Sequence, residues 1–390
     1  MSEEHVVHHE ETQEPRPAEP RPAVQAPQTQ TREQERPSFT TRRDVEQGIL
    51  YVGIDLGTSQ TVISASNGTR DVVESFVGYP IDLVSRKLLN KDVLFGADAL
   101  KNRMALQLYR PLAKGVIKHS DEYAGVTAEE VEGNLEAAKA LIQHVVQLAD
   151  PQPHDLVYGV IGCPAQASIR NKQSIIEAAR EVLDSVVICS EPFAVAYGLG
   201  NLAGSLVIDI GAGTTDLCRM KGAMPSEDDQ ITLFEAGDFI DEQLFRLFQE
   251  RCEGAQFNIN MVKQIKERYG FVTEAAEPVM VTFPVGGKPV EFDVTEELRH
   301  ACRMIIDPII DAMEELIGSY DPEFQDQLRR NVILAGGGSR IHGLDKALEE
   351  ALCELGGGSV KAVHEPVFAG ANGALKIAYD MPEDTWEQLR

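Results

Sequence analysis

The sequence lacks the apolar runs that would cross a membrane. No apolar stretch of the 390-residue chain approaches the roughly 18 residues that a bilayer span requires. The N-terminus lacks the charged-then-apolar order of a signal peptide, and neither end carries an amphipathic helix suited to a membrane surface. We therefore expect a cytoplasmic protein without direct membrane insertion.

The chain also lacks the patterns of a zinc site, a disulfide framework and a nucleic-acid-binding surface. Its six cysteines include no C-x-x-C pair, which fits a reducing cytoplasm. Its net charge of -26 would repel nucleic-acid phosphates, and no local basic patch offsets that charge. The sequence thus predicts no direct nucleic-acid partner.

Two common nucleotide-binding motifs are missing as well. Neither G-x-x-x-x-G-K-[ST] nor a dinucleotide G-x-G-x-x-G occurs between a predicted strand and a predicted helix. A nucleotide site in this chain would therefore be neither a P-loop nor a Rossmann cleft. Phosphate-binding turns have to be sought in other glycine-rich segments.

The first 48 residues differ in composition from the rest. They are rich in Glu, Gln, Pro, Arg and Thr and hold hardly any large apolar side chains, as in the segment Glu14-Pro-Arg-Pro-Ala-Glu-Pro-Arg-Pro22. Such a segment cannot bury enough apolar surface to offset the entropy lost on ordering. We predict a disordered tail over residues 1–48, which serves either as a solubilising extension or as a tether for partners.

From Ile49 onward the sequence alternates between strand-like and helix-like patterns. The predicted strands are 49–54, 157–161, 186–188, 206–210 and 331–334. The predicted helices are 135–148, 169–183, 241–251 and 295–319. Alternation of this kind implies mostly parallel sheets covered by helices.

Two segments of this α/β region carry a similar motif. Asp55-Leu-Gly57-Thr58-Ser59 and Asp209-Ile-Gly211-Ala-Gly213-Thr214-Thr215 each follow an apolar run. Each predicts a buried strand ending in a turn whose backbone N–H groups and hydroxyls can bind phosphate oxygens. The aspartate at each strand end can hold a magnesium ion between the turns. The duplication therefore predicts two similar halves that clamp a nucleotide.

Three further segments are candidates for the same site, and each also has a simpler interpretation. Gly336-Gly337-Gly338 follows the last predicted strand, where glycines would let a planar base approach, although such a turn is often only a turn. Glu191 begins a predicted helix, where it is either a helix-terminal charge or a group that orients a water. Lys266 and Glu267 would ordinarily lie on a solvated helix face.

In this order the motifs resemble the phosphate, connecting and adenosine motifs of the actin, Hsp70 and sugar-kinase superfamily, over residues 49–380. Bacterial actins fit best, because segments 95–103 and 109–117 look like stretches of MreB proteins. Still more similar are the magnetosome actins, the MamK family, in segments 77–80, 160–165, 207–216, 229–233, 335–343 and 386–389. The first two motifs are shared across the superfamily, whereas the combination is specific.

The resemblance implies an α/β fold of the actin-like ATPase type, with two ribonuclease-H-like halves around a nucleotide cleft. The first implied domain covers 49–204, with a small insertion at about 79–118. The second covers 205–390, with an insertion at about 240–295 and a C-terminal helix that returns to the first domain. The tail has no counterpart in typical members of the family, so its role stays open.

The resemblance also assigns residues to ATP and Mg2+. It implies that Asp55 and Asp209 position the magnesium, and that Asp209 and Glu191 serve catalysis, Glu191 by orienting the attacking water. The phosphates would be surrounded by Gly57, Thr58, Ser59, Gly211, Gly213, Thr214 and Thr215, and the ribose and base by Lys266, Glu267, Gly336, Gly337 and Gly338. Because Thr61 and Val62 stand near the place of the phosphate lysine of eukaryotic actin, the charge balance would have to come from magnesium.

As a function, the resemblance implies an ATP-dependent polymerising actin whose cytoplasmic filaments organise and position magnetosomes, with hydrolysis driving filament turnover. The implied partners are further copies of the chain and cargo-adaptor proteins on magnetosomes. Another bacterial actin, of the plasmid-segregating or cell-shape type, is the main alternative, because cargo cannot be read from a polymerising fold. A sugar kinase would need a sugar pocket with a catalytic aspartate, and an Hsp70 would need a following peptide-binding domain; we identify neither.

Overall fold

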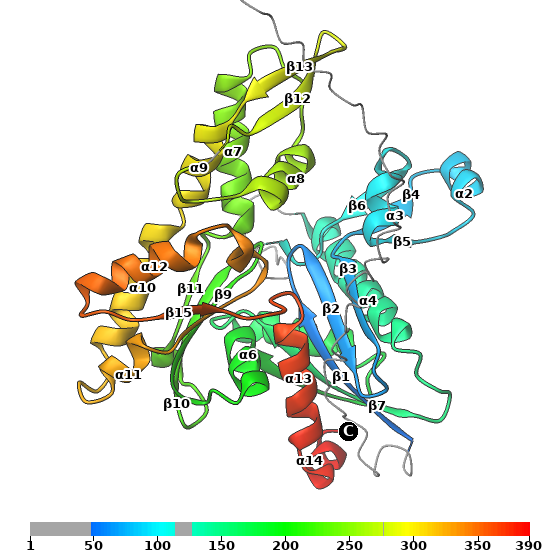
Figure 1. Cartoon of the computed structure of the whole chain (residues 1–390). Coiled ribbons are helices and arrows are strands. Elements are labelled where there is room, and N and C mark those ends of the chain that lie inside the picture. Colours follow the sequence, from blue (N-terminus) through cyan, green and yellow to red (C-terminus); the bar gives the residue numbers. More distant parts are fainter. Residues whose placement is uncertain (1–47, 114–126, 276) are drawn as a thin grey trace, which may run out of the picture. The chain divides into compact units, whose positions relative to one another are not determined.

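Two five-stranded sheets with equivalent strand order underlie the fold (Figure 1). The computed structural model describes residues 48–113, 127–275 and 277–390, so the tail predicted over residues 1–48 lies outside the described residues except for its last position. The first sheet has the order β3-β2-β1-β7-β8, with bounds β1 Ile49–Leu56, β2 Gln60–Ala65, β3 Arg70–Glu74, β7 Leu156–Cys163 and β8 Ser185–Ser190. The second has the order β11-β10-β9-β14-β15, with bounds β9 Ala203–Ile210, β10 Thr215–Lys221, β11 Gln230–Leu233, β14 Val332–Ala335 and β15 Val360–Ala362.

The strand directions repeat along with the order. In each sheet the first three strands along the chain pair antiparallel. The last two strands run parallel to the first strand of their sheet. The five predicted strands correspond to β1, β7, β8, β9 and β14, with ends that differ by a few residues. The prediction of two similar α/β halves is thereby confirmed.

The central strands form because their apolar side chains are buried on both faces, as expected for strands covered by helices. On β1, Val52 and Ile54 belong to one core and Tyr51 to another on the opposite face. On β9, Ile208 and Val207 divide in the same way between two cores. Each half therefore has its own hydrophobic core, and a further apolar layer lies on the other face of its sheet.

Helices cover these sheets. The first sheet is packed by α4 Ala128–Leu148 and α5 Ile169–Ala179, and the core of the second half includes α10 Ile306–Gly318 and α12 Leu344–Glu354. Thr127 begins α4 with a reciprocal capping interaction with Glu130, which satisfies N–H groups that the helix itself cannot pair. A short helix of the second half, α11 Gln325–Arg329, follows α10 along the chain.

One predicted helix is wrong in its extent. The segment 295–319 forms two helices, α9 Thr295–Arg303 and α10 Ile306–Gly318. Pro308 explains the break, because it has no N–H to donate to the carbonyl of Met304 in a continuous helix. In the structure Pro308 lies in the first turn of α10, where no such hydrogen bond is needed.

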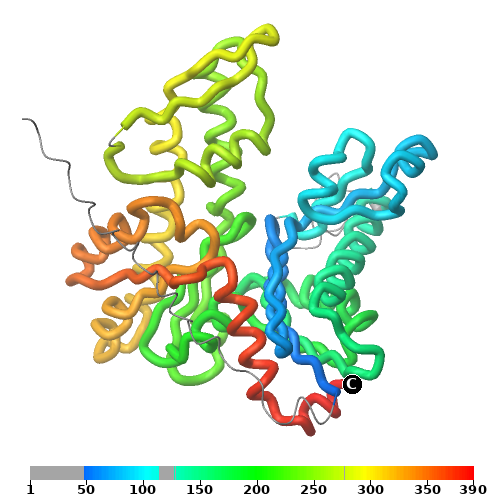
Figure 2. Tube along the Cα trace, turned by 45° about the vertical axis from the view of Figure 1, so that its right-hand side comes forward, coloured from blue at the N-terminus to red at the C-terminus, as the bar shows by residue number. Residues whose placement is uncertain are grey.

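Two helices connect the halves. α6 Glu191–Leu199 leaves the first sheet, and α13 Ala369–Asp380 packs against both α6 and β1 (Figure 2). The approach requires glycine, because a Cβ at Gly373 would lie 1.8 Å from the carbonyl oxygen of Ala194. The chain then ends in α14 Glu383–Leu389, whose Trp386 ring stacks on Tyr158 of β7 at a centroid distance of 5.1 Å. The C-terminus therefore packs on the first sheet.

Each half carries an additional group of elements, and both groups project in the same direction (Figure 1). In the first half these elements are β4 Val77–Pro80, α2 Leu83–Leu89, β5 Leu94–Phe95, α3 Gly96–Lys101, η1 Arg103–Ala105 and β6 Leu106–Tyr109. In the second half they are α7 Gly237–Arg251, α8 Ile259–Tyr269, the hairpin of β12 Met280–Val285 and β13 Lys288–Asp293, and α9. Every helix in the described ranges is too short or too polar to cross a bilayer.

Candidate functional site

A cavity of about 660 Å³ is lined by the turns that follow β1 and β9. Its volume lies within the range of roughly 300–1,000 Å³ that is usual for small-molecule sites. With one exception, all the residues that the sequence assigned to ATP or metal line this cavity. The exception is Thr215, whose hydroxyl is turned to the carbonyl oxygen of Glu235 at 2.9 Å. Thr215 therefore holds the base of the second turn and does not face the cavity.

The two predicted phosphate turns occupy equivalent places. The first connects the paired residues Leu56 and Thr61 of β1 and β2, and the second connects Ile210 and Thr215 of β9 and β10. Asp55 and Asp209 stand one residue before these pairs, at the ends of buried strands. The sequence duplication is thus a duplication in space, and it directs two similar turns toward one cavity.

The backbone of these turns is tightly fixed. A Cβ at Gly57 would lie 2.7 Å from the carbonyl oxygen of Gln60, which explains the glycine. In the second turn, the N–H of Gly211 donates to the carbonyl oxygen of Thr214 at 2.9 Å. The N-terminus of α7 supports the same turn, because the N–H of Asp238 donates to the carbonyl oxygen of Ala212 at 2.7 Å.

Four carboxyl groups share the buried end of the cavity region. Burial, followed by the nearby charge of Asp216, raises the pKa of Asp55 to about 7. Burial and the charges of Asp55 and Asp216 raise the pKa of Asp209 well above its usual value, and the pKa of Glu191 is raised for the same reasons. Carboxylates crowded in this way favour a cation between them.

The residues present fit a magnesium ion. Asp55 and Asp209 offer the hard oxygen ligands that magnesium prefers. Among the described residues, no group of three or more His, Cys, Asp or Glu side chains is arranged to hold a metal ion. Magnesium commonly uses one or two carboxylates and completes its shell with waters and substrate phosphates.

Glu191 is the first residue of α6, directly after β8, as the sequence predicted. Pro192 lies in the first turn of this helix. Gly162 of β7 leaves room for the Glu191 side chain, because a Cβ at residue 162 would lie 3.3 Å from Cγ of Glu191. The position directs Glu191 to the cavity, and its role as a water-orienting group stays a prediction.

Asp216 connects the halves next to this site. One of its carboxylate oxygens accepts from the N–H of Ala165, at 2.8 Å, and from the hydroxyl of Thr232, at 2.6 Å. Ala165 belongs to the loop after β7 in the first half, and the preceding Pro164 lines the cavity. Asp216 is the last residue of the MamK-like segment 207–216, but this role could not be inferred because its partner Ala165 is distant along the chain.

The third glycine turn lines the cavity, and the structure adds a packing reason for two of its glycines; their contact with a base stays a prediction. A Cβ at Gly336 would lie 2.3 Å from Oδ1 of Asp209, and a Cβ at Gly338 would lie 2.2 Å from the Ile210 side chain. A Cβ at Gly337 would meet no described atom within 4 Å. Packing against the end of β9 therefore requires two of these glycines, whereas Gly337 leaves open space beside the cavity.

Lys266 is not on a solvated helix face. Its side chain is 11% exposed, and its ammonium group lies 2.8 Å from the Asp241 carboxylate and 2.7 Å from the carbonyl oxygen of Gly237. Burial raises the pKa of Asp241 to about 6, although Lys266 opposes the rise. Lys266 thus joins α8 to the start of α7, while Glu267, one residue on, is 54% exposed.

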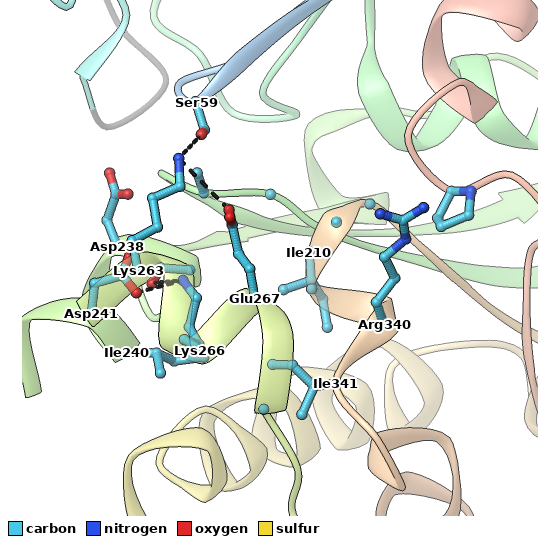
Figure 3. A pocket seen from close by; sticks show the side chains of 18 of the residues that line it. Ser59, Ile210, Asp238, Ile240, Asp241, Lys263, Lys266, Glu267, Arg340 and Ile341 are labelled. Carbon is cyan, nitrogen blue, oxygen red and sulfur yellow. Dashed lines mark hydrogen bonds and ion pairs between the residues drawn. The ribbon is translucent and has the colours of Figure 1, made fainter. Parts of the chain in front are cut away.

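Three lysine and arginine residues that line the cavity, Lys263, Arg268 and Arg340, were missed by the sequence reasoning. Lys263 extends from α8 to the hydroxyl of Ser59, and Arg340 lies near the third glycine turn (Figure 3). Lys263 could have been noticed, because it stands one helical turn before Lys266 and four residues before Glu267. Arg340 stands two residues after the last glycine of the predicted turn, which was a usable signal as well.

Comparison with known proteins agrees with this geometry. The sequence model of the MreB/Mbl protein family matches residues 50–385. The actin-like protein MamK of Paramagnetospirillum magneticum strain AMB-1 is 40% identical over 340 residues, which cover 87% of this chain and 95% of that protein. The solved MamK double helical filament has a TM-score of 0.81 and 39% identity, over 85% of this chain and 99% of that one. A non-polymerising MamK mutant bound to AMPPNP has a TM-score of 0.65 and 39% identity, over 86% of this chain and 100% of that one.

Two duplicated halves, with paired aspartate and glycine turns at one cavity, define an actin-like protein. The match over residues 50–385 narrows this class to the bacterial MreB/Mbl group. The chain belongs, within that group, to the MamK family of actin-like proteins.

Proposed function

We propose that this protein is an ATP-dependent polymerising actin that forms cytoplasmic filaments and hydrolyses ATP as the filaments turn over. The observation that carries the proposal is the pair of equivalent turns, each preceded by a buried aspartate, at one cavity. The likeness to the MamK filament supports the polymerising part of the proposal.

In this proposal the polyphosphate of ATP lies between the two turns. Backbone N–H groups and the hydroxyls of Thr58, Ser59 and Thr214 surround its oxygens, while Asp55 and Asp209 face the magnesium. When bound, magnesium would supply positive charge that offsets the charge of the phosphates and of the carboxylates. The base lies toward Gly337, Glu267 and the other residues beyond the third glycine turn.

Glu191 orients the water that attacks the terminal phosphate. It is held at the start of α6, and burial raises its pKa well above the usual value. A carboxyl group with a raised pKa is suited to receive a proton near neutral pH. Because α6 also packs against α13, a change at the phosphate is transmitted to the contact between the two halves.

Filament growth needs a surface that a second copy covers. Apolar side chains of α2 and the residues before it are strongly exposed: Ile81 at 59%, Leu83 at 82%, Val84 at 75% and Leu88 at 76%. Exposed apolar surface of this kind marks interaction sites. We assign these four residues to a head-to-tail contact, in which unlike surfaces meet and the assembly does not close into a ring.

The cargo proposed from the family is the magnetosome, reached through adaptor proteins. Another bacterial actin, of the plasmid-segregating or cell-shape type, stays the alternative. The 40% identity to MamK over nearly the whole of that protein favours the magnetosome role. Filaments that co-localise with magnetosomes in the cell that produces this protein would support the role, and filaments that follow a plasmid would refute it.

Sedimentation tests the proposal directly. The purified protein should pellet with ATP and magnesium, and EDTA should reduce the pelleted fraction. Electron microscopy of the same sample should reveal filaments. A protein that stays monomeric at high concentration with ATP and magnesium would refute polymerisation, and a protein that releases no phosphate would refute the ATPase activity.

A further inference from the structure

The phosphate end of the cavity is short of positive charge in its own turns. The residues of the two turns are Gly57, Thr58, Ser59 and Gln60 in the first, and Gly211, Ala212, Gly213 and Thr214 in the second. Neither turn contains lysine or arginine, and buried carboxylates stand behind both. A bound triphosphate would add further negative charge, so cations have to come from other elements.

Lys263 brings a cation to this place from the opposite half. It lies on α8, its side chain is 21% exposed, and its ammonium group contacts Oγ of Ser59 in the first turn (Figure 3). A carboxylate oxygen of Glu267 lies 3.7 Å from the same ammonium group. The cation therefore faces a neutral hydroxyl at close range and a largely exposed carboxylate at longer range.

The other basic residues of the cavity are placed differently. Lys266 is held by Asp241 and by the carbonyl oxygen of Gly237. Arg268 lies over the Tyr269 ring at 5.0 Å, and Arg340 lies on the far side of the pocket from Ser59 (Figure 3). Of these four cavity side chains, Lys263 is the one whose charge reaches the first turn. Arg110 also donates to the Thr58 carbonyl oxygen, but it does not line the cavity and is paired with Asp238.

We propose that Lys263 binds the phosphates of the nucleotide at the first turn and thereby draws the second half of the molecule onto the first. The assignment rests on the proposed ATP site. A phosphate oxygen is a stronger partner for an ammonium group than a serine hydroxyl is, because the hydrogen bond is then charged on both sides. Lys263 thus supplies charge that the sequence assigned to magnesium alone, and it does so from a distant segment.

Nucleotide binding by Lys263→Met tests the assignment. Methionine keeps an unbranched apolar stem and removes the charge. We expect the affinity for ATP with magnesium to fall on the order of 10- to 100-fold, as for the loss of a hydrogen bond between charged groups. The affinity for ADP should fall less, and the affinity for adenosine should not change. Lys263→Arg, which keeps the charge, should retain most of the ATP affinity.

Two further variants separate a phosphate contact from a structural role. Lys346→Met, on α12, removes a lysine that pairs with Glu349 at 2.8 Å and does not line the cavity, and this variant should bind all three ligands normally. Glu267→Gln removes the other partner of Lys263 and should not reproduce the selective loss of ATP. Equal losses for ATP and adenosine in Lys263→Met would show a collapsed pocket and overturn the assignment, as would unchanged ATP affinity. Wild-type protein that binds adenosine but not ATP, or neither, would instead refute the proposed ATP site itself.

Discussion

Arg110 and Asp238 join the two halves through a paired ion bridge. Nη1 of Arg110 lies 2.8 Å from Oδ2 of Asp238, and Nη2 lies 2.9 Å from Oδ1. Nε of Arg110 also donates to the carbonyl oxygen of Thr58, at 3.0 Å. The backbone N–H of Asp238 donates to the carbonyl oxygen of Ala212. One bridge therefore touches the backbone of both proposed phosphate turns, one in each half.

We expect this bridge to couple the turns energetically. Arg110→Met and Asp238→Asn should each lower the affinity for ATP, because the first removes the donor to the Thr58 carbonyl oxygen and the second removes the carboxylate that orients this donor. In a double-mutant cycle on the free energy of unfolding, the pair should show a coupling of about 1 kcal/mol, the upper part of the range for partly exposed pairs. The exposed pair Arg330 and Asp326, in the same kind of cycle, should show no measurable coupling. Additive effects at Arg110 and Asp238 would contradict the prediction.

The second prediction separates binding from chemistry. Glu191→Ala should still bind ATP and form filaments, but its phosphate release should fall on the order of 10²-fold, as for the loss of a positioned acid or base. Its filaments should persist longer because their nucleotide stays intact. Asp209→Asn should lower both ATP affinity and turnover, since Asp209 faces the magnesium in the proposed site. Wild-type phosphate release from Glu191→Ala filaments would return Glu191 to the role of a helix-terminal charge.

The third prediction concerns the exposed apolar residues of α2. Leu88→Lys should raise the concentration needed for polymerisation, because it places a charge in the proposed contact, and it should leave ATP affinity unchanged. Gln147→Lys, on the exposed face of α4, adds the same charge without removing apolar surface and should polymerise normally. Sedimentation over a range of protein concentrations measures both. Normal assembly of Leu88→Lys would place the filament contact elsewhere.

The sequence predicted the features that depend on local pattern. Asp55 and Asp209, with the glycines that follow them, are recognisable because a strand end and its turn lie within a few residues. Likewise, Pro192 indicated the start of α6. In contrast, Lys263 with Ser59 and Arg110 with Asp238 are pairs whose members are far apart along the chain. No periodicity specifies which distant side chains meet, so these cross-cleft contacts required the fold.

Local pattern also gave wrong or incomplete reasons for some residues. From the sequence alone, Lys266 is expected on the surface of a polar helix. Its partner Asp241 lies on another helix, so the local pattern does not indicate the pair. Gly336 and Gly338 are glycines because β9 packs against them, and a sequence cannot distinguish that cause from close approach of a ligand. Pro308 is a signal for a break in the sequence. The amphipathic pattern continues on both sides of it, however, and favoured a single helix.

The fourth prediction concerns the buried carboxylate Asp229. Burial by itself raises the pKa of Asp229, but hydrogen bonds from Lys221, Ser226 and Arg219 lower it well below the usual value. A group whose pKa is lowered in the folded state contributes stability above its unfolded pKa of about 4, and this stability is lost as the pH falls below that value. The free energy of unfolding should therefore decline steeply in acid.

Asp229→Asn measures this contribution. At neutral pH it should lower the free energy of unfolding by about 3 kcal/mol, because it leaves the buried Arg219 without its ion partner. The acid dependence of the variant should be shallower than that of the wild type. Asp326→Asn, at an exposed carboxylate, should change stability far less. Urea unfolding at several pH values provides the comparison, and parallel curves for wild type and Asp229→Asn would contradict the assignment.

The fifth prediction addresses the crossing of α6 and α13. Gly373→Ala should lower the free energy of unfolding by about 1–3 kcal/mol or more, the usual cost of overpacking a core, because the new Cβ meets the backbone carbonyl of Ala194, which cannot rotate away. Gly318→Ala is the matched control. It lies at the end of α10, where a Cβ would meet no described atom within 4 Å, so it should be neutral or slightly stabilising.

The crossing also predicts a functional effect at a distance. Ala194 lies one helical turn after Glu191, so a displaced α6 should carry Glu191 away from the cavity. Gly373→Ala filaments should therefore release phosphate more slowly, although residue 373 does not line the cavity. Measurements well below the unfolding temperature separate this effect from loss of folded protein. If Gly373→Ala lowered stability but released phosphate at the wild-type rate, the contact would be structural, and the position of Glu191 would be independent of α13.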